Sequence, residues 1–256
     1  MWESIIITNN QIKNEHIKKI INGKNSSIII KNFLKKEDCE KIIEKISRMN
    51  IERDSNKYNH IGPFLMNYTT KKEKYFEKAS KANEIFKEIF MNIENPVDKI
   101  KTTILKNFPN YEISDKKENQ KNYALCTIRQ HEKGKSIPLH KDNVSYEGAE
   151  YEVSKINTQL SCILHIQETE KGGNLSIYNK QWEKKFEKHR EIKFGYNPII
   201  KENTLVDTIE PKLGDLVIIN PNYFHEVKKI QGNSDRITLG IFFGIENETK
   251  KIFSWA

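Results

Sequence analysis

The chain contains little cysteine. Its three cysteines, Cys39, Cys126 and Cys162, match no zinc-binding spacing and no disulfide framework. A chain of 256 residues is long enough to bury an apolar core without disulfides or structural zinc. We therefore expect reduced thiols in a cytoplasmic protein, with Cys126 and Cys162 in strands of the core.

Long apolar runs are also absent. No run approaches the roughly 18 apolar residues that a membrane helix needs. The first residues, MWESIIITNNQIKNEH, lack a basic leader, a sufficient apolar stretch and a small-residue cleavage site, so we expect neither secretion nor a membrane partner. With 36% hydrophobic and 30% charged residues, the composition predicts a globular chain.

Arginine is scarce, although the formal net charge is +8. Only five of the 43 basic residues are arginine, the residue best suited to bidentate phosphate and base contacts. Residues 121–256 carry 20 basic against 18 acidic residues, so this half is nearly neutral. The charge therefore indicates a solvated lysine-rich surface, and we do not expect a nucleic-acid partner.

Hydrophobic periodicity divides the chain into two unlike parts. Residues 1–120 are expected to be mainly helical, because apolar residues recur at helical spacing after Lys35 and between Tyr75 and Phe108, where Pro96 divides two helices. Residues 121–256 contain short apolar or alternating runs with turn signals between them, which predict strands of a sandwich or barrel. The expected strand segments are YALCTIRQ, SIPLH, QLSCILHI, NLSIY, TLVDTI, DLVIIN, FHEVKKI, RITLGIFFG and KIFSW. Two long polar segments, 141–158 and 179–203, interrupt them and are expected to border a functional site.

The absence of repeats and clear linkers favours one domain over residues 1–256. The predicted fold class is α+β and mainly β, with a jelly-roll-like β core covered on one face by N-terminal helices.

One histidine begins a His-x-Asp motif within SIPLHKDN. Residues two apart on a strand face the same side, so His140 and Asp142 can face one ion. A second imidazole from a late strand would complete the facial triad of non-haem iron(II) oxygenases, and His225 in INPNYFHEV fits that position. Arg236 follows eleven residues later with Thr238 on the same face, and a fixed cation beside a metal suits a dicarboxylate.

These motifs together resemble the iron(II)- and 2-oxoglutarate-dependent dioxygenases, especially the prolyl-hydroxylase-like branch. The resemblance covers Ile28 to Phe243 and rests on FLKKEDCEKII, TIRQHEKGKSIPLHKDN, GGNLSIY, PKLGDLVIINPNYFHEV and RITLGIFFG. It implies a double-stranded β-helix of the cupin type that binds iron(II) through His140, Asp142 and His225. It also implies 2-oxoglutarate and O2 as co-substrates, with Arg236 on the distal carboxylate, helped by Thr238.

The resemblance also bears on reaction and substrate. Related halogenases have Ala or Gly where this chain has Asp142, so halogenation is disfavoured. A looser similarity to enzymes that hydroxylate or halogenate free amino acids rests on IPLHKDN and the tryptophan near the C-terminus. We expect a hydroxylase of a free amino acid or related metabolite. The alternatives are a protein side-chain (prolyl-type) hydroxylase, a nucleic-acid demethylase and a non-enzymatic jelly-roll binding module.

Several further residues are candidates for the site. Tyr123 is a candidate for hydrogen bonding to the co-substrate, and Arg129 faces either substrate or solvent. Glu150 and Glu152, with Glu147, form an acidic cluster after the motif that would favour a cationic substrate if it points inward. Trp255 either closes the pocket or is a surface aromatic residue.

Overall fold

The computed structural model describes residues 2–9, 11–49, 52–53, 59–114, 117–191 and 195–256. Helices dominate its first part, as expected, and two of them lie on either side of Pro96. The helices are α1 (Asn14–Ile21), α2 (Lys36–Ser47), α3 (Lys72–Phe90), α4 (Pro96–Leu105) and the short α5 (Val144–Glu147). The 3-10 turns are η1 (Leu65–Tyr68), η2 (Glu152–Ser154), η3 (Lys184–His189) and η4 (Pro198–Lys201).

The start of α4 illustrates how local sequence sets a boundary. Pro96 occupies the first turn, where its missing N–H costs no hydrogen bond. The side chain of Asn95 accepts hydrogen bonds from the backbone N–H groups of Val97 and Asp98 and so caps the helix. Sequence alone therefore located this break between α3 and α4 correctly.

The described strands form a large sheet of ten strands and a small sheet of four. The large sheet has the order β1-β2-β13-β10-β15-β8-β4-β3, with β16 beside β15 and β5 beside β16. Its strands are β1 (Ile5–Ile7), β2 (Ser27–Ile30), β3 (Glu52–Arg53), β4 (Asn59–Ile61), β5 (Glu112–Ser114), β8 (Thr127–His131), β10 (Thr158–Gln167), β13 (Leu216–Ile219), β15 (Arg236–Glu246) and β16 (Lys251–Trp255). The small sheet has the order β12-β11-β14-β9, and a separate hairpin joins β6 to β7. These strands are β9 (Ile137–His140), β11 (Leu175–Gln181), β12 (Val206–Ile209), β14 (Tyr223–Val227), β6 (Lys117–Glu118) and β7 (Lys121–Asn122).

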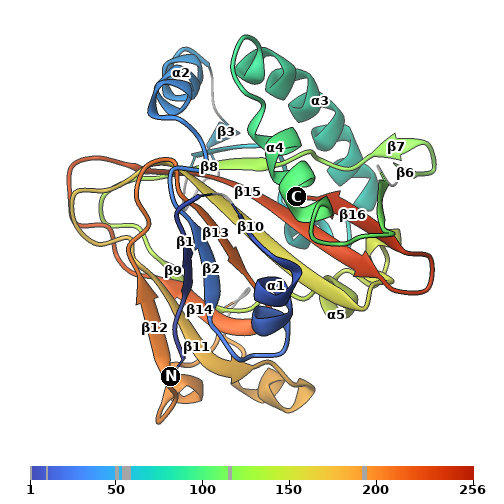
Figure 1. Cartoon of the computed structure of the whole chain (residues 1–256), viewed down its shortest axis with the longest axis vertical. Coiled ribbons are helices and arrows are strands. Elements are labelled where there is room, and N and C mark those ends of the chain that lie inside the picture. The colour runs from blue at the N-terminus through green and yellow to red at the C-terminus, as the bar shows by residue number, and fades with distance from the viewer. Residues whose placement is uncertain (1, 10, 50–51, 54–58, 115–116, 192–194) are drawn as a thin grey trace.

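The two faces of the large sheet have different partners. On β10, Leu160, Cys162 and Leu164 pack into a core shared with α1 to α4. The alternate residue Ile163 packs into a second core with β11 and β14 of the small sheet. In Figure 1, α2, α3 and α4 lie on one side of β8, β10 and β15, whereas β11, β12 and β14 lie on the other. This arrangement directs every second residue of β8, β10 and β15 toward the space between the sheets.

The N-terminal part contributes more than helices. Strand β2 pairs with β13 over four residues, from Ser27 opposite Ile219 to Ile30 opposite Leu216. All four residues of β2 are buried, because they extend the large sheet past β13. The mainly helical first part thus also supplies a strand, and its apolar run IIIKNFL from residue 28 has a composition typical of one.

The expected strands after Tyr123 are all present at the predicted places. All three cysteines are buried and unpaired, with Cys126 and Cys162 in the core as predicted. No helix among the described residues is long and apolar enough to cross a membrane.

Candidate metal centre and co-substrate site

The three predicted metal ligands lie together between the sheets. Strands β9 and β14 pair so that His140 stands directly opposite His225, with ring centroids 4.1 Å apart. Asp142 follows the end of β9, and its backbone N–H donates to the carbonyl of Pro221, 2.9 Å away. One potential ligand atom from each of the three residues lies within 4.8 Å of the others, and all three residues are buried. This is the donor set of an iron(II) facial triad.

Hydrogen bonds fix the two imidazoles for metal binding. Nδ1 of His140 lies 2.8 Å from the carbonyl of Pro138, and Nδ1 of His225 lies 2.8 Å from that of Tyr223. A carbonyl only accepts, so each Nδ1 carries the proton and each Nε2 presents a lone pair. Such outer hydrogen bonds orient histidine ligands, and here the strand backbone provides them.

The protonation states also suit a metal. Burial, with His225 nearby, lowers the pKa of His140 to about 4, so its ring is neutral near neutral pH. Burial opposes ionisation of Asp142, but the adjacent imidazoles of His225 and His140 and the charge of Arg129 lower its pKa below the usual value. A neutral His140 ring and an ionised carboxylate are therefore available without proton release.

Arg236 lies buried at the start of β15, and Thr238 lies two residues along on the same face. Burial, with repulsion from Arg129, lowers the pKa of Arg236 to about 9. No hydrogen bond or ion pair engages its guanidinium in the described part of the chain. Gly173 lies beside it, and a Cβ there would sit 3.3 Å from Cδ of Arg236. A buried cation without a counter-ion is a site for an anion.

Two histidines that the sequence did not single out flank this arginine. His131 on β8 stands opposite Arg236, and His165 on β10 stands opposite Thr238. Burial, followed by the charge of Arg236, lowers the pKa of both well below the usual value, so both rings are neutral. His165 and Arg236 also line a cavity of about 180 Å³, which leaves space beside the guanidinium. The sequence could have suggested His131 as a site residue, because it lies two residues after Arg129 on the same predicted strand. His165 could be recognised only from the pairing of β10 with β15.

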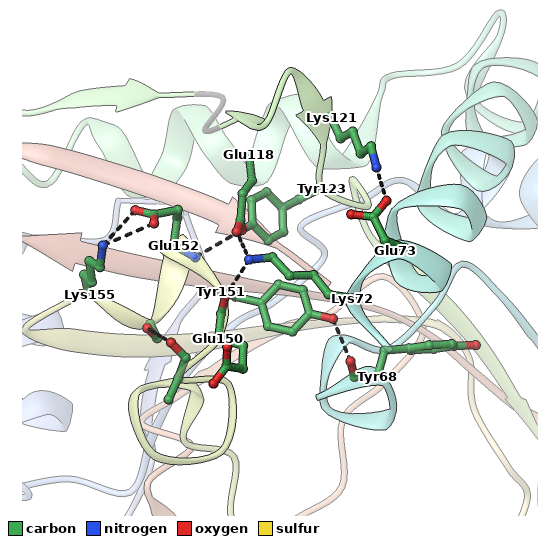
Figure 2. A network of polar contacts seen from close by, with 12 residues as sticks. Tyr68, Lys72, Glu73, Glu118, Lys121, Tyr123, Glu150, Tyr151, Glu152 and Lys155 are labelled. Carbon is green, nitrogen blue, oxygen red and sulfur yellow. Dashed lines mark hydrogen bonds and ion pairs between the residues drawn. The ribbon is translucent and has the colours of Figure 1, made fainter. Parts of the chain in front are cut away.

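Tyr123 is not positioned as expected. Its hydroxyl donates to the buried carboxylate of Glu118, which also pairs with Lys72 and accepts from the backbone N–H of Glu152 (Figure 2). Burial, reinforced by Glu118, raises the pKa of Tyr123 far above its usual value. The hydroxyl is therefore committed to a structural network that joins the β6–β7 hairpin to α3, which corrects its assignment to the co-substrate.

We predict that Tyr123→Phe leaves 2-oxoglutarate affinity unchanged while lowering stability. The substitution removes a hydrogen bond to a charged group, which costs about 1.5–3 kcal/mol. Calorimetric titration with 2-oxoglutarate and thermal unfolding measure the two effects. A large loss of co-substrate affinity at unchanged stability would restore Tyr123 to the site.

The acidic cluster does not gather around the metal. Glu150 is exposed, and the carboxylate of Glu152 pairs with Lys155, 3.1 Å away, on the outside of the loop (Figure 2). The carboxylate of Glu147 pairs with Lys141, the residue between the first two candidate ligands. The expectation of an acidic pocket for a cationic substrate therefore loses its support, because Glu150 is exposed and the other two carboxylates pair with lysines.

Trp255 is buried, so the alternative that it is a surface aromatic residue is wrong. Its ring stacks on Phe242 of the neighbouring strand at a centroid distance of 5.9 Å. Phe242 shares its face of β15 with Arg236 and Thr238. Trp255 therefore supports one wall of the site through Phe242.

The residue between the first two ligands faces away from the metal. The Lys141 side chain is fully buried, with Nζ 3.0 Å from a Glu147 oxygen and 4.5 Å from the centre of the Trp182 ring. The same carboxylate oxygen lies 2.8 Å from Arg190. These contacts, which we name the Lys141 clamp, tie segment 141–158 to the described part of segment 179–203 directly behind the ligand pair.

We predict that Glu147→Gln loosens both segments together. The loss of its charge weakens the contacts to Lys141 and Arg190 at once, so hydrogen exchange should quicken in residues 144–154 and 182–191. Exchange in the paired strands β10 and β15 should remain slow. Exposed Glu77→Gln, which affects only a surface pair with Lys81, is the matched control. Faster exchange in one segment alone would contradict the clamp.

A known protein family matches this chain over nearly its whole length. The family model described as carrier-protein-independent halogenase WelO5 matches residues 2–256. A relative from Purpureocillium lilacinum, the leucinostatins biosynthesis cluster protein S, is 26% identical over 183 residues, which cover 68% of this chain and 73% of the relative. The L-gamma-glutamyl-L-propargylglycine hydroxylase of Streptantibioticus cattleyicolor is 27% identical over 109 residues, covering 42% of this chain and 40% of the hydroxylase.

Solved structures share the fold at low sequence identity. An N-substituted L-amino acid dioxygenase from Burkholderia ambifaria has a TM-score of 0.62 at 15% identity, with 95% of this chain and 91% of that chain covered. HygX from Streptomyces hygroscopicus, solved with nickel and 2-oxoglutarate bound, has a TM-score of 0.56 at 9% identity, with 92% and 87% covered. With the triad and the full-length family match, these findings identify the chain as a member of the WelO5 family of carrier-protein-independent halogenases, and hence as an enzyme of the iron(II)- and 2-oxoglutarate-dependent oxygenase superfamily.

Proposed function

We propose that this protein uses iron(II), 2-oxoglutarate and O2 to hydroxylate an unactivated C–H bond of a small, amino-acid-like substrate. The observation that carries the proposal is a complete His-Asp-His triad between two sheets that also hold a buried arginine without a counter-ion. We further propose that residues 1–256 act as one domain and that the two facing sheets form a double-stranded β-helix, with helices on the outer face of the large sheet.

Each residue then has a defined task. His140, Asp142 and His225 would hold the iron on one side and leave the other positions open. The bound iron supplies the oxidation, in which decarboxylation of 2-oxoglutarate to succinate and CO2 is coupled to insertion of oxygen into the substrate. Arg236 would bind the distal carboxylate of 2-oxoglutarate, with the Thr238 hydroxyl beside it. The neutral rings of His131 and His165 would border the same carboxylate without competing for it.

Hydroxylation is favoured over halogenation by the third ligand. A halide needs a coordination position that the Asp142 carboxylate would take in this chain. Asp142 is ionised, and its backbone is held by the carbonyl of Pro221, so the carboxylate is fixed beside the two imidazoles. The chain thus combines a halogenase family match with the ligand set of a hydroxylase.

A small substrate is supported by the relatives. One curated relative is named as a hydroxylase of a glutamyl-propargylglycine dipeptide, and one structural neighbour as an N-substituted amino acid dioxygenase. Hydroxylation of a protein side chain is the second candidate, because the prolyl-hydroxylase-like motifs are equally compatible with it. A nucleic-acid demethylase is disfavoured by the nearly neutral C-terminal half, and a binding module without turnover by the intact triad and arginine.

We predict that Asp142→Gly loses iron affinity and hydroxylation together, since two imidazoles remain as ligands. The isosteric Asp142→Asn, which removes the charge alone, should lose less affinity. Product mass is measured with and without chloride. A chlorinated product from the wild-type protein would overturn the hydroxylase assignment.

The decisive experiment is anaerobic loading with iron(II) and 2-oxoglutarate, followed by exposure to air with a substrate panel. The panel contains free amino acids, short peptides and methylated oligonucleotides, and succinate formation above the substrate-free rate is the readout. The proposal expects stimulation by amino acids and a product heavier by one oxygen atom. Stimulation by peptides or oligonucleotides alone would favour the corresponding alternative, and failure to bind 2-oxoglutarate would exclude the oxygenase function.

A further inference from the structure

A second arginine faces the space between the sheets. Arg129 lies on β8, where it stands opposite Thr238 of β15 and two residues from His131. It therefore shares the face of the sheet that holds Arg236. Its positive charge acts on His140 and Asp142 on one side and on Arg236 on the other. Arg129 thus lies within electrostatic range of both the metal triad and Arg236.

The surroundings of Arg129 are built to hold its guanidinium. A Cβ on Gly240 would lie 2.4 Å from Nη2 of Arg129, so a side chain at residue 240 would displace the guanidinium. On its other side, the guanidinium carbon lies 5.8 Å from the centre of the Phe64 ring. Phe64 in turn contacts Phe242 at a centroid distance of 5.9 Å. The arginine is therefore placed beside an aromatic wall and against a glycine.

This guanidinium has no anionic partner among the described residues. Its Nε–H is buried and donates no hydrogen bond to the described residues, although the residue as a whole is partly accessible. The other partly buried arginine of the described chain, Arg190, is paired with Glu147 and Glu187. A buried guanidinium N–H without an acceptor is costly, so its position beside the triad indicates a ligand that supplies the acceptor.

The formal charges of the loaded site support the same conclusion. Iron(II), Arg129 and Arg236 would contribute four positive charges, while Asp142 and 2-oxoglutarate contribute three negative ones. One positive charge remains, and it is the charge of Arg129. A carboxylate on the substrate would offset this charge locally, whereas a substrate without a carboxylate would leave the Arg129 guanidinium unpaired at low dielectric constant.

We propose that Arg129 is the specificity residue that binds a carboxylate of the primary substrate beside the aromatic wall of Phe64 and Phe242. The inference rests on the proposed function and deepens it, because it requires a substrate with a free carboxylate. A free amino acid or an N-substituted amino acid meets that requirement, and an internal proline of a protein chain does not.

The carboxylate could instead belong to 2-oxoglutarate, which offers a second one at its reactive end. The two sources differ in what a substitution does to co-substrate affinity. The test therefore compares Arg129→Gln with Arg236→Gln, using Arg129→Lys as the conservative variant. Exposed Arg48→Gln on α2 is the matched control for loss of one positive charge. Circular dichroism and thermal unfolding establish that each variant is folded.

The probes are free L-amino acids and their C-terminal amides, offered as matched pairs to protein loaded with iron(II) and 2-oxoglutarate. Binding is measured anaerobically by calorimetry, and succinate formation is measured in air. We expect wild type to bind at least one acid roughly ten- to hundredfold more tightly than its amide. Arg129→Gln should lose this preference and keep its affinity for 2-oxoglutarate, Arg129→Lys should retain part of the preference, and Arg48→Gln should behave as wild type.

Three results would overturn the inference. The first is an acid preference that persists in Arg129→Gln, and the second is a wild-type protein that prefers no acid of the panel. The third is a loss of 2-oxoglutarate affinity in Arg129→Gln as large as in Arg236→Gln, which would assign the carboxylate to the co-substrate. If Arg129→Gln does not fold, the inference is tested by the acid preference of Arg129→Lys compared with that of wild type. Normal succinate formation without acid preference rejects this inference alone, whereas absence of 2-oxoglutarate binding in wild type rejects the proposed function.

Discussion

Alanine at His225 or at His140 is expected to abolish iron(II) binding and all succinate formation. The two imidazoles are cross-strand partners, and each is fixed by its own backbone carbonyl, so neighbouring side chains cannot replace either ring. Loss of an outer partner of a metal ligand already costs roughly 10- to 100-fold in affinity. Loss of the ligand itself should exceed that range, as measured by anaerobic iron titration.

The matched control for these variants is His189→Ala. His189 also begins a His-x-acidic sequence, His-Arg-Glu, but it lies in η3, outside the triad. Iron affinity should be unchanged in this variant. Wild-type iron affinity in both His140→Ala and His225→Ala would refute the metal assignment.

Replacement of Arg236 with glutamine is expected to raise the dissociation constant for 2-oxoglutarate by roughly ten- to over a hundredfold, because a hydrogen bond to a charged group contributes about 1.5–3 kcal/mol. Iron affinity should remain near that of wild type, since Arg236 is not a ligand. Arg236→Lys keeps the charge but lacks the planar fork, so it should recover only part of the affinity.

Anaerobic titration of the iron-loaded protein with 2-oxoglutarate measures this effect, and Arg48→Gln again serves as the control for charge. The burial of Arg236 without a counter-ion makes a second outcome measurable. Saturating 2-oxoglutarate should raise the unfolding temperature of wild type and have much less effect on Arg236→Gln. An unchanged titration curve in Arg236→Gln would move the anchor to another cation, with Arg129 the first candidate.

Much of this architecture could be predicted because it is encoded locally. The period of apolar residues and Pro96 located α2, α3 and α4, and alternating runs located the strands after Tyr123. The two glycines at 172 and 173 both adopt positive φ, a conformation that glycine accepts without strain. The pairing of β2 with the distant β13, in contrast, depends on the tertiary fold.

The destinations of polar side chains were harder to predict, since they depend on which strands pair. Tyr123 lies near the site in sequence, but its hydroxyl is bound by Glu118 from the β6–β7 hairpin. The cluster around Glu150 and Glu152 suggested an acidic pocket, yet Glu150 is exposed and the carboxylate of Glu152 pairs with Lys155. Neither outcome is visible without the packing of α3 against the loop that follows Asp142.

The sequence by itself singled out the candidate metal ligands and the candidate co-substrate arginine, because strand periodicity puts His140 and Asp142, and likewise Arg236 and Thr238, on one side of the backbone. The tertiary structure decided the rest of the site. Pairing of β8 with β15 brings Arg129 onto Gly240 and His131 beside Arg236, and pairing of β10 with β15 adds His165. These neighbours are separated by tens of residues along the chain, and only the register of the large sheet makes them adjacent.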